Sequence, residues 1–153
     1  MQIVGFNLTK ILAERKLDLS ENKSINTNIE FPKIEKEKIE LLKDAEAYRI
    51  DFKFTVSYSK NQNQEKEKEK DKEKDKAGEI AFQGNIILSI GKDEPKEIIK
   101  SLKKEELPLQ MKEAFLNLLL KKCTAKALDL EDQLGLPFHV PFPRVKLQAE
   151  EKK

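Results

Sequence analysis

The sequence predicts an α+β fold: a four-stranded antiparallel sheet followed by two C-terminal helices packed on one face. Three observations support this prediction. Apolar and polar residues alternate over residues 48–58, and the same period of two recurs over residues 80–90. After residue 93 the apolar spacing becomes helical, so the C-terminal third supplies the helices that cover the apolar face of the sheet.

The two clearest strands flank a run of alternating charges, EKEKEKDKEKDK, at residues 65–76. Its acidic and basic residues cancel, and it has no apolar side chain whose burial would offset the entropy lost on ordering. We therefore expect a disordered hairpin loop at about residues 60–78, and deletion of residues 65–76 should leave the fold and client binding nearly intact. The chain is otherwise expected to form one domain over residues 1–153, with a mobile tail from about residue 147.

Two weaker strands precede this hairpin. The first has apolar residues that alternate and then shift phase, as a β-bulge produces: Val4, Phe6, Leu8, Ile11 and Ala13. The second contains Ile25, Ile29 and Phe31, and Pro32 is expected to end it. A glycine inside the fourth strand, Gly84, predicts a bulge or a close backbone approach.

Two helices are predicted after the sheet. The first starts at Asp93-Glu94-Pro95 and is stopped or bent at Leu107-Pro108, and the second runs from about Leu109 to Leu128. The second helix is apolar over well over half of its circumference, at Met111, Phe115, Leu116, Leu118, Leu119, Leu120, Cys123 and Ala127. One sheet face cannot cover that much, so the remainder meets either a second apolar partner, such as another protomer or a client, or a larger single core.

The end of the chain, LPFHVPFPRV at residues 136–145, contains three prolines and is therefore expected to be extended. It is either a strap packed on the core or a wall of an apolar groove.

Composition narrows the class of protein. The formal net charge is only +2 although 38% of the residues are charged, which argues against a nucleic-acid partner. No segment approaches the roughly 20 apolar residues of a membrane span, and the N-terminus does not resemble a secretory signal, so we expect a cytoplasmic protein with no membrane partner. Abundant Lys and Glu with few Cys and Met give a thermophile-like composition.

The sequence contains no recognisable catalytic or metal-binding motif, so we expect neither an enzyme nor a bound cofactor or metal. Cys123 is the single cysteine, which excludes an intrachain disulfide, and its leucine-rich surroundings indicate a buried thiol. His139 is the single histidine and is expected to be a packed or surface residue.

The order of the elements, together with several short stretches, resembles the SecB family of export chaperones. The stretches span residues 6 to 145 and read FNLTKI at 6–11, AYRIDFKFTV at 47–56, GNIILSI at 84–90, Leu136-Pro137, and Pro143-Arg144-Val145. The entry to the second helix departs from the family pattern, since it reads Leu107-Pro108-Leu109-Gln110 here.

The resemblance implies a homotetramer, a dimer of dimers, that holds unfolded polypeptides in apolar grooves without ATP. By position it places Ile25, Phe115, Leu118 and Leu119 along a peptide-binding groove. The extended tail would add Leu136, Phe138, Val140 and Phe142. The two acidic positions at which the family's first strand contacts the SecA motor hold Arg15 and Leu19 here, so transfer to a SecA-type motor is not expected.

The leading hypothesis is therefore an ATP-independent holdase-type chaperone that binds unfolded or nascent polypeptides, with protein export as one setting. The alternative is a SecB-like regulatory or structural module with one dedicated protein partner, for example a toxin-antitoxin-associated chaperone. A small-ligand or enzymatic function would instead require a closed, polar-lined pocket.

Overall fold

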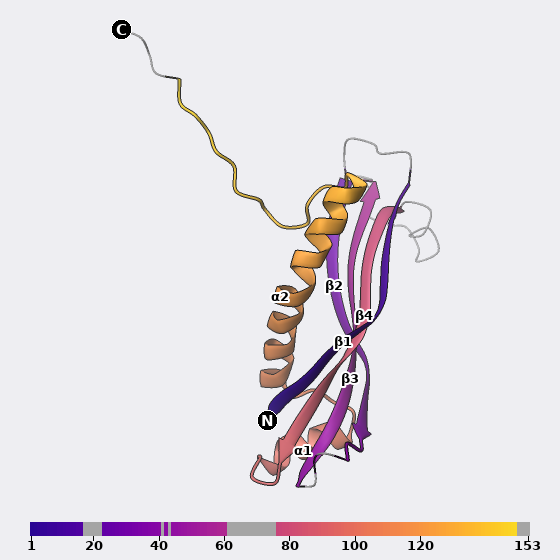
Figure 1. The fold of residues 1–153 in the computed structure, drawn as a ribbon, viewed down its shortest axis with the longest axis vertical. Coiled ribbons are helices and arrows are strands. Elements are labelled where there is room, and N and C mark those ends of the chain that lie inside the picture. The colour runs from indigo at the N-terminus through magenta and orange to yellow at the C-terminus, as the bar shows by residue number, and fades with distance from the viewer. Residues whose placement is uncertain (17–22, 41, 43, 61–75, 150–153) are drawn as a thin grey trace, which may run out of the picture.

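Figure 1 shows a computed structural model of the protein, which describes residues 1–16, 23–40, 42, 44–60 and 76–149. Its elements are, in chain order, β1 (Gln2–Arg15), β2 (Lys23–Glu37), β3 (Ala45–Lys60), β4 (Lys76–Gly91), α1 (Lys96–Lys103) and α2 (Leu109–Leu134). The four strands form one antiparallel sheet, and the long helix α2 lies along one of its faces. The predicted α+β architecture is confirmed.

The strand order is β1-β4-β3-β2, so β1 and β2, which are consecutive in sequence, form the two opposite edges of the sheet. β3 and β4 pair antiparallel up to Ser59 opposite Lys76, which confirms the predicted hairpin. β4 already begins at Lys76, earlier than the predicted loop end at about residue 78. Residues 61–75, which hold most of the charged run, lie outside the described residues.

The predicted bulge in β1 and the predicted close approach at Gly84 occur at the same place. The pairing of β1 with β4 shifts register immediately after Leu8, which lies opposite Gly84. A Cβ atom on Gly84 would stand 2.0 Å from the carbonyl oxygen of Asn7, so only glycine allows β1 to lie this close. A second register shift, between Ile3 and Gly5, was not predicted.

The prediction that Pro32 ends the second strand was wrong, because β2 continues to Glu37. The register of β2 against β3 shifts between Glu30 and Lys33, so Pro32 lies in the irregular step. Proline lacks an amide hydrogen, but an edge strand with an irregularity at that point accommodates it. Beyond the shift, Ile34 is buried again.

The second helix is longer than predicted and ends at Leu134. Gly135 follows it in the left-handed conformation, with φ of 64°, and its N–H donates to the Asp132 carbonyl at 3.2 Å. Arg15, at the end of β1, donates from Nη1 to the Leu134 carbonyl at 2.7 Å and places a positive charge at the negative end of the helix. A contact between β1 and the end of α2 therefore helps to fix where the helix stops.

The core lies between the sheet and the helices. As the alternation predicts, every second residue of the central strands is buried: Tyr48, Ile50, Phe52, Phe54, Val56 and Tyr58 in β3, and Ile80, Phe82, Ile86, Leu88 and Ile90 in β4. Leu102 of α1 and Leu136 beyond α2 close the two ends of this cluster.

Candidate functional site

Helix α2 contacts the sheet through a narrow row of side chains. Its buried residues recur at every fourth position: Met111, Phe115, Leu119, Cys123, Ala127 and Glu131. Such a row forms one narrow ridge along the helix, so it covers a strip of the sheet rather than its full width. Apolar side chains on either side of that strip keep part of their surface uncovered.

The residues predicted to line a groove fall into three groups by burial. Phe115, Leu119 and Leu136 are buried in the core. Ile25, Leu118 and Val140 are partly buried. Phe138 and Phe142 are exposed, with ring centroids 5.5 Å apart. Within this chain, only the last two groups have surface with which to meet a ligand.

One set of uncovered apolar side chains lies between α2 and the edge strand β1, and we call it the β1 flank. It consists of Ile3, Phe6, Leu8 and Ile11 of β1 and Leu118 of α2. The side of α2 that faces β1 is identified by Lys122, whose Nζ lies 5.8 Å from the Phe6 ring centroid. Leu118 lies one helical turn before Lys122 and so on the same side.

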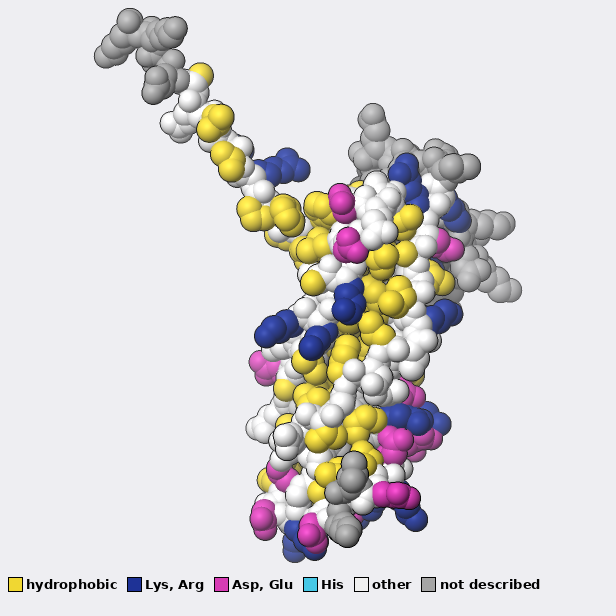
Figure 2. Space-filling view, viewed as in Figure 1, with side chains coloured by type: hydrophobic (Ala, Val, Ile, Leu, Met, Phe, Trp, Pro, Cys, Tyr) yellow, Lys and Arg dark blue, Asp and Glu magenta, His cyan; other side chains and the backbone are white. Residues whose placement is uncertain are grey.

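The β1 flank remains accessible although it belongs to the face that α2 covers. Ile11 pairs with the buried Phe82, which places both side chains on that face, yet Ile11 is 57% exposed. Phe6 is half-buried and stacks on Phe52 with ring centroids 5.3 Å apart. Figure 2 shows hydrophobic side chains gathered in a band beside α2. The sequence predicted apolar alternation in β1 but gave no sign that α2 leaves this strand uncovered.

A second apolar surface, which we call the β2 flank, lies on the other side of α2. It consists of Ile25, Ile29 and Phe31 of β2 and Leu116 and Leu120 of α2. Phe31 of β2 packs against Phe115 with ring centroids 6.3 Å apart. Lys112 of α2 shares a hollow of about 550 Å³ with Ile29 and Phe31. The helix side that carries Lys112 also carries Leu116 and Leu120 one and two turns further on. Ile25 and Ile29 are partly buried against the core, and Leu120 is exposed.

The chain after α2, residues 136–149, leaves the body of the molecule as an extended segment that we call the tail (Figure 1). Only its first part packs: Leu136 is buried, and the His139 side chain is 2% exposed. From Pro141 to Ala149 every residue is exposed. The interpretation of this segment as a strap on the core therefore holds only for residues 136–140, and the remainder forms no groove wall within the same chain.

The tail is attached through a buried polar cluster that sequence reasoning missed. Glu131 is fully buried, and its Oε1 accepts a hydrogen bond from the Tyr58 hydroxyl at 2.6 Å. The same oxygen lies 2.5 Å from Nδ1 of His139 and 3.3 Å from the His139 amide nitrogen, which donates to it. The other ring nitrogen of His139, Nε2, is buried and has no hydrogen-bond partner within the part of the chain that the structure describes. A lone Glu within a polar stretch carries no local signal that it is the next member of the buried row.

Three titratable groups on the buried side of α2 and β3 are held neutral: Cys123, Tyr48 and Tyr58, where burial, followed by the hydrogen bond to Glu131, raises the pKa of Tyr58. Burial raises the pKa of the Cys123 thiol to about 11. Burial, followed by the hydrogen bond to Glu46, raises the pKa of Tyr48 to about 12. Cys123 is thus the buried thiol that the sequence predicted, and it is unsuited to be a nucleophile. Among the described residues no group of three or more His, Cys, Asp or Glu is placed to hold a metal ion.

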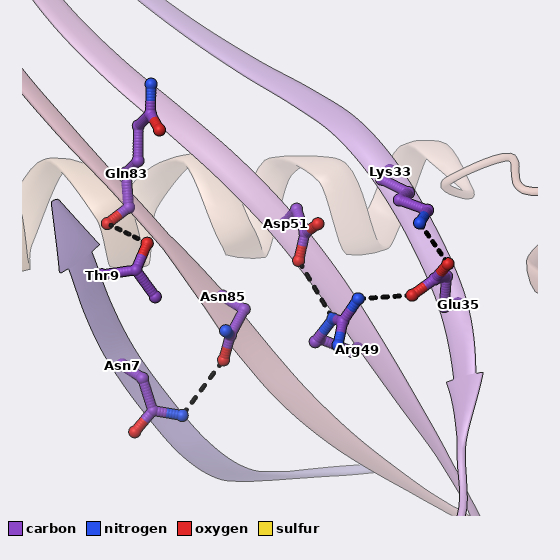
Figure 3. Close-up of polar contacts among 8 residues, drawn as sticks. All are labelled: Asn7, Thr9, Lys33, Glu35, Arg49, Asp51, Gln83 and Asn85. Carbon is purple, nitrogen blue, oxygen red and sulfur yellow. Dashed lines mark hydrogen bonds and ion pairs between the residues drawn. The ribbon is translucent and has the colours of Figure 1, made fainter.

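The opposite face of the sheet is polar (Figure 3). Nδ2 of Asn7 donates to Asn85 Oδ1 across β1 and β4 at 3.0 Å. Arg49 pairs with Glu35 and with Asp51, the latter at 3.2 Å from Nε. The hydrogen bond from Lys33 is the main reason that the pKa of Glu35 is lowered, and Arg49 adds to it. These polar groups therefore satisfy one another on this face.

Neither a protein-family model nor a curated protein matches the chain. What the structure establishes is the class, an α+β domain with an open four-stranded antiparallel sheet and two C-terminal helices. In the part of the chain that the structure describes, neither helix has the length and apolar character needed to span a bilayer.

Proposed function

We propose that this protein is an ATP-independent holdase that binds unfolded or nascent polypeptides through the β1 flank. The observation that carries the proposal is the group of apolar side chains beside α2 that the helix leaves uncovered, including Ile11 and the half-buried Phe6 and Leu8. An exposed apolar patch beside a free strand edge suits an extended, non-native chain.

Binding of this kind needs no nucleotide, because it is a reversible equilibrium. Burying one large apolar side chain of a client contributes roughly 1.5–3 kcal/mol, whereas association and ordering of the client cost several kcal/mol. A few apolar residues per client segment therefore give moderate affinity. That affinity suffices to delay aggregation and still allows release.

From the resemblance to the SecB family we further propose that this activity operates in the cytoplasm, with a homo-oligomer, a dimer of dimers, as the working form. Transfer to a SecA-type motor is not part of the proposal. Arg15, at one of the positions where the family carries an acidic contact residue, is engaged here with the end of α2, while Leu19 lies outside the described residues. We propose no enzymatic activity and no cofactor.

The test is suppression of aggregation of a chemically denatured client protein, followed by light scattering without ATP. The wild-type chain in molar excess should delay aggregation. The variant Phe6→Ser/Ile11→Ser should bind client roughly tenfold more weakly, because it removes apolar contact area worth about 1.4 kcal/mol or more. Leu109→Ser is the matched control, since Leu109 is apolar and 83% exposed but lies at the start of α2 and outside the β1 flank.

Failure of the wild-type chain to delay aggregation would overturn the proposal. So would an equal loss in the Leu109→Ser variant, because any exposed apolar residue would then serve. Affinity capture from cells separates the alternative function. A heterogeneous set of captured proteins supports the holdase, whereas one stoichiometric protein would identify a module with a single dedicated partner.

A further inference from the structure

The exposed tail and the hollow on the β2 flank have complementary chemistry. In the tail, Phe142 is 61% exposed, Val145 88% and Leu147 92%, and the cations Arg144 and Lys146 are interspersed among them. The hollow combines apolar side chains, among them Ile29, Phe31 and Leu107, with the carboxylates of Glu30, Glu105 and Glu106 and the cation of Lys112, so its charged groups carry an excess of negative charge. An extended segment that alternates apolar and basic residues therefore matches an apolar hollow with an acidic rim.

The rim of the hollow is built in an unusual way. Glu105 is the one non-glycine residue with positive φ among the described residues, at 60°. This left-handed conformation costs free energy for a residue with a Cβ atom, and it occurs where the surroundings require it. It belongs to the tight turn between α1 and α2, in which the amide of Glu106 donates to the Ser101 carbonyl at 2.9 Å. Neither Glu105 nor Glu106 has a hydrogen bond or ion pair from its side chain among the described residues, so both carboxylates are available to an external cation.

The tail of the same chain is poorly placed to fill this hollow. Lys112 marks the hollow and Leu134 the end of α2, and a rise of about 1.5 Å per residue separates them by roughly 33 Å. The eight residue steps from Leu136 to Arg144 span at most about 26–29 Å when fully extended. The tail also points away from the body (Figure 1), and the Glu131–His139 contact fixes the position from which it leaves.

We propose that residues 142–147 of the tail bind the hollow of a second copy of this chain, and that the tail of the second copy binds the hollow of the first. The exchange is reciprocal, so it closes a two-fold symmetric dimer and leaves no unpaired site. Arg144 and Lys146 meet the carboxylates of Glu105 and Glu106, while Val145 and Leu147, which alternate with them on the other side of the extended segment, enter the apolar part. Pro141 and Pro143 keep the tail extended before binding, which lowers the entropy cost of docking. The β1 flank stays free, so the exchange does not depend on client binding.

The test uses charge reversal in two separate variants of the full chain. One variant carries Arg144→Glu/Lys146→Glu and therefore has an acidic tail and an acidic hollow. The other carries Glu105→Lys/Glu106→Lys and has a basic tail and a basic hollow. Sedimentation and native mass spectrometry should show that each variant alone self-associates at least tenfold more weakly than the wild type. When the two are mixed, they should form a heterodimer, because each tail then meets a hollow of opposite charge.

The control variant is Lys96→Glu/Lys121→Glu, which reverses two exposed lysines elsewhere and should self-associate like the wild type. Circular dichroism checks that all variants keep the fold. A wild-type chain that stays monomeric at every concentration would overturn the proposal. Unchanged self-association in either charge-reversal variant, or a mixture without heterodimer, would also overturn it, since the tail would then bind its own chain or nothing.

Discussion

The buried cluster of Tyr58, Glu131 and His139 gives the sharpest test of the packing. The Tyr58 hydroxyl donates to Glu131 at 2.6 Å in a fully buried site, so Tyr58→Phe should lower the free energy of unfolding by about 1.5–3 kcal/mol. Glu131→Ala removes the acceptor of both neighbours and leaves their polar groups buried without a partner. Its expected cost is about 3–5 kcal/mol, a large part of the roughly 5–15 kcal/mol that stabilises a typical domain.

Urea unfolding followed by circular dichroism measures these losses as shifts of the midpoint at constant slope. The double variant Tyr58→Phe/Glu131→Ala should cost at least about 1 kcal/mol less than the sum of the single changes, because the two side chains share one hydrogen bond. Asp129→Ala, at an exposed position of the same helix, is the control and should change the free energy by less than about 0.5 kcal/mol. Strictly additive losses, or losses below about 0.5 kcal/mol for both single variants, would show that the cluster does not hold α2 to the sheet.

Three further predictions follow from the sheet and its core. Gly84→Ala should destabilise the protein by about 3 kcal/mol in the same urea assay, because the alanine Cβ would stand 2.0 Å from the Asn7 carbonyl oxygen. A loss below about 1 kcal/mol would mean that β1 moves away easily. Stability should be complete below about pH 9 and should fall as the pH rises through the pKa of Cys123, about 11, and of Tyr48, about 12, because the folded state holds both groups neutral. In an alkaline titration tyrosinate absorbance should therefore appear together with loss of circular dichroism, because the pKa of both tyrosines is raised; ionisation of either tyrosine near pH 10 with the fold intact would contradict this. Deleting residues 65–75 should leave the unfolding midpoint and client binding nearly unchanged. β3 and β4 still pair at Ser59 and Lys76, and the shorter connection changes the free energy of loop closure by only about 1 kcal/mol. A large loss of client binding would make that segment part of the binding site.

The elements whose signal is local could be predicted from the residues alone. The period of two in β3 and β4 and the helical spacing after Pro95 come from neighbours along the chain, so they identify strands and helices directly. The bulge in β1 and the close approach at Gly84 were also predictable, since a phase shift and an in-strand glycine are visible in the residues themselves. The glycine that ends α2 was equally visible, and Gly135 could have extended the predicted helix to its observed end.

The contacts between these elements could be read only from the folded structure. Nothing local predicts that β1 and β2 occupy opposite edges, that Arg15 contacts the end of α2, or that Glu131 is buried against Tyr58. Each of these depends on residues far apart in sequence, which only the folded chain brings together. The narrow contact of α2 with the sheet determines which apolar side chains are core and which, like Ile11, remain at the surface. Hydrophobicity identifies the side chains that could be buried. The position of α2 on the sheet determines which of them are buried, because a narrow contact row covers only the side chains directly beneath it.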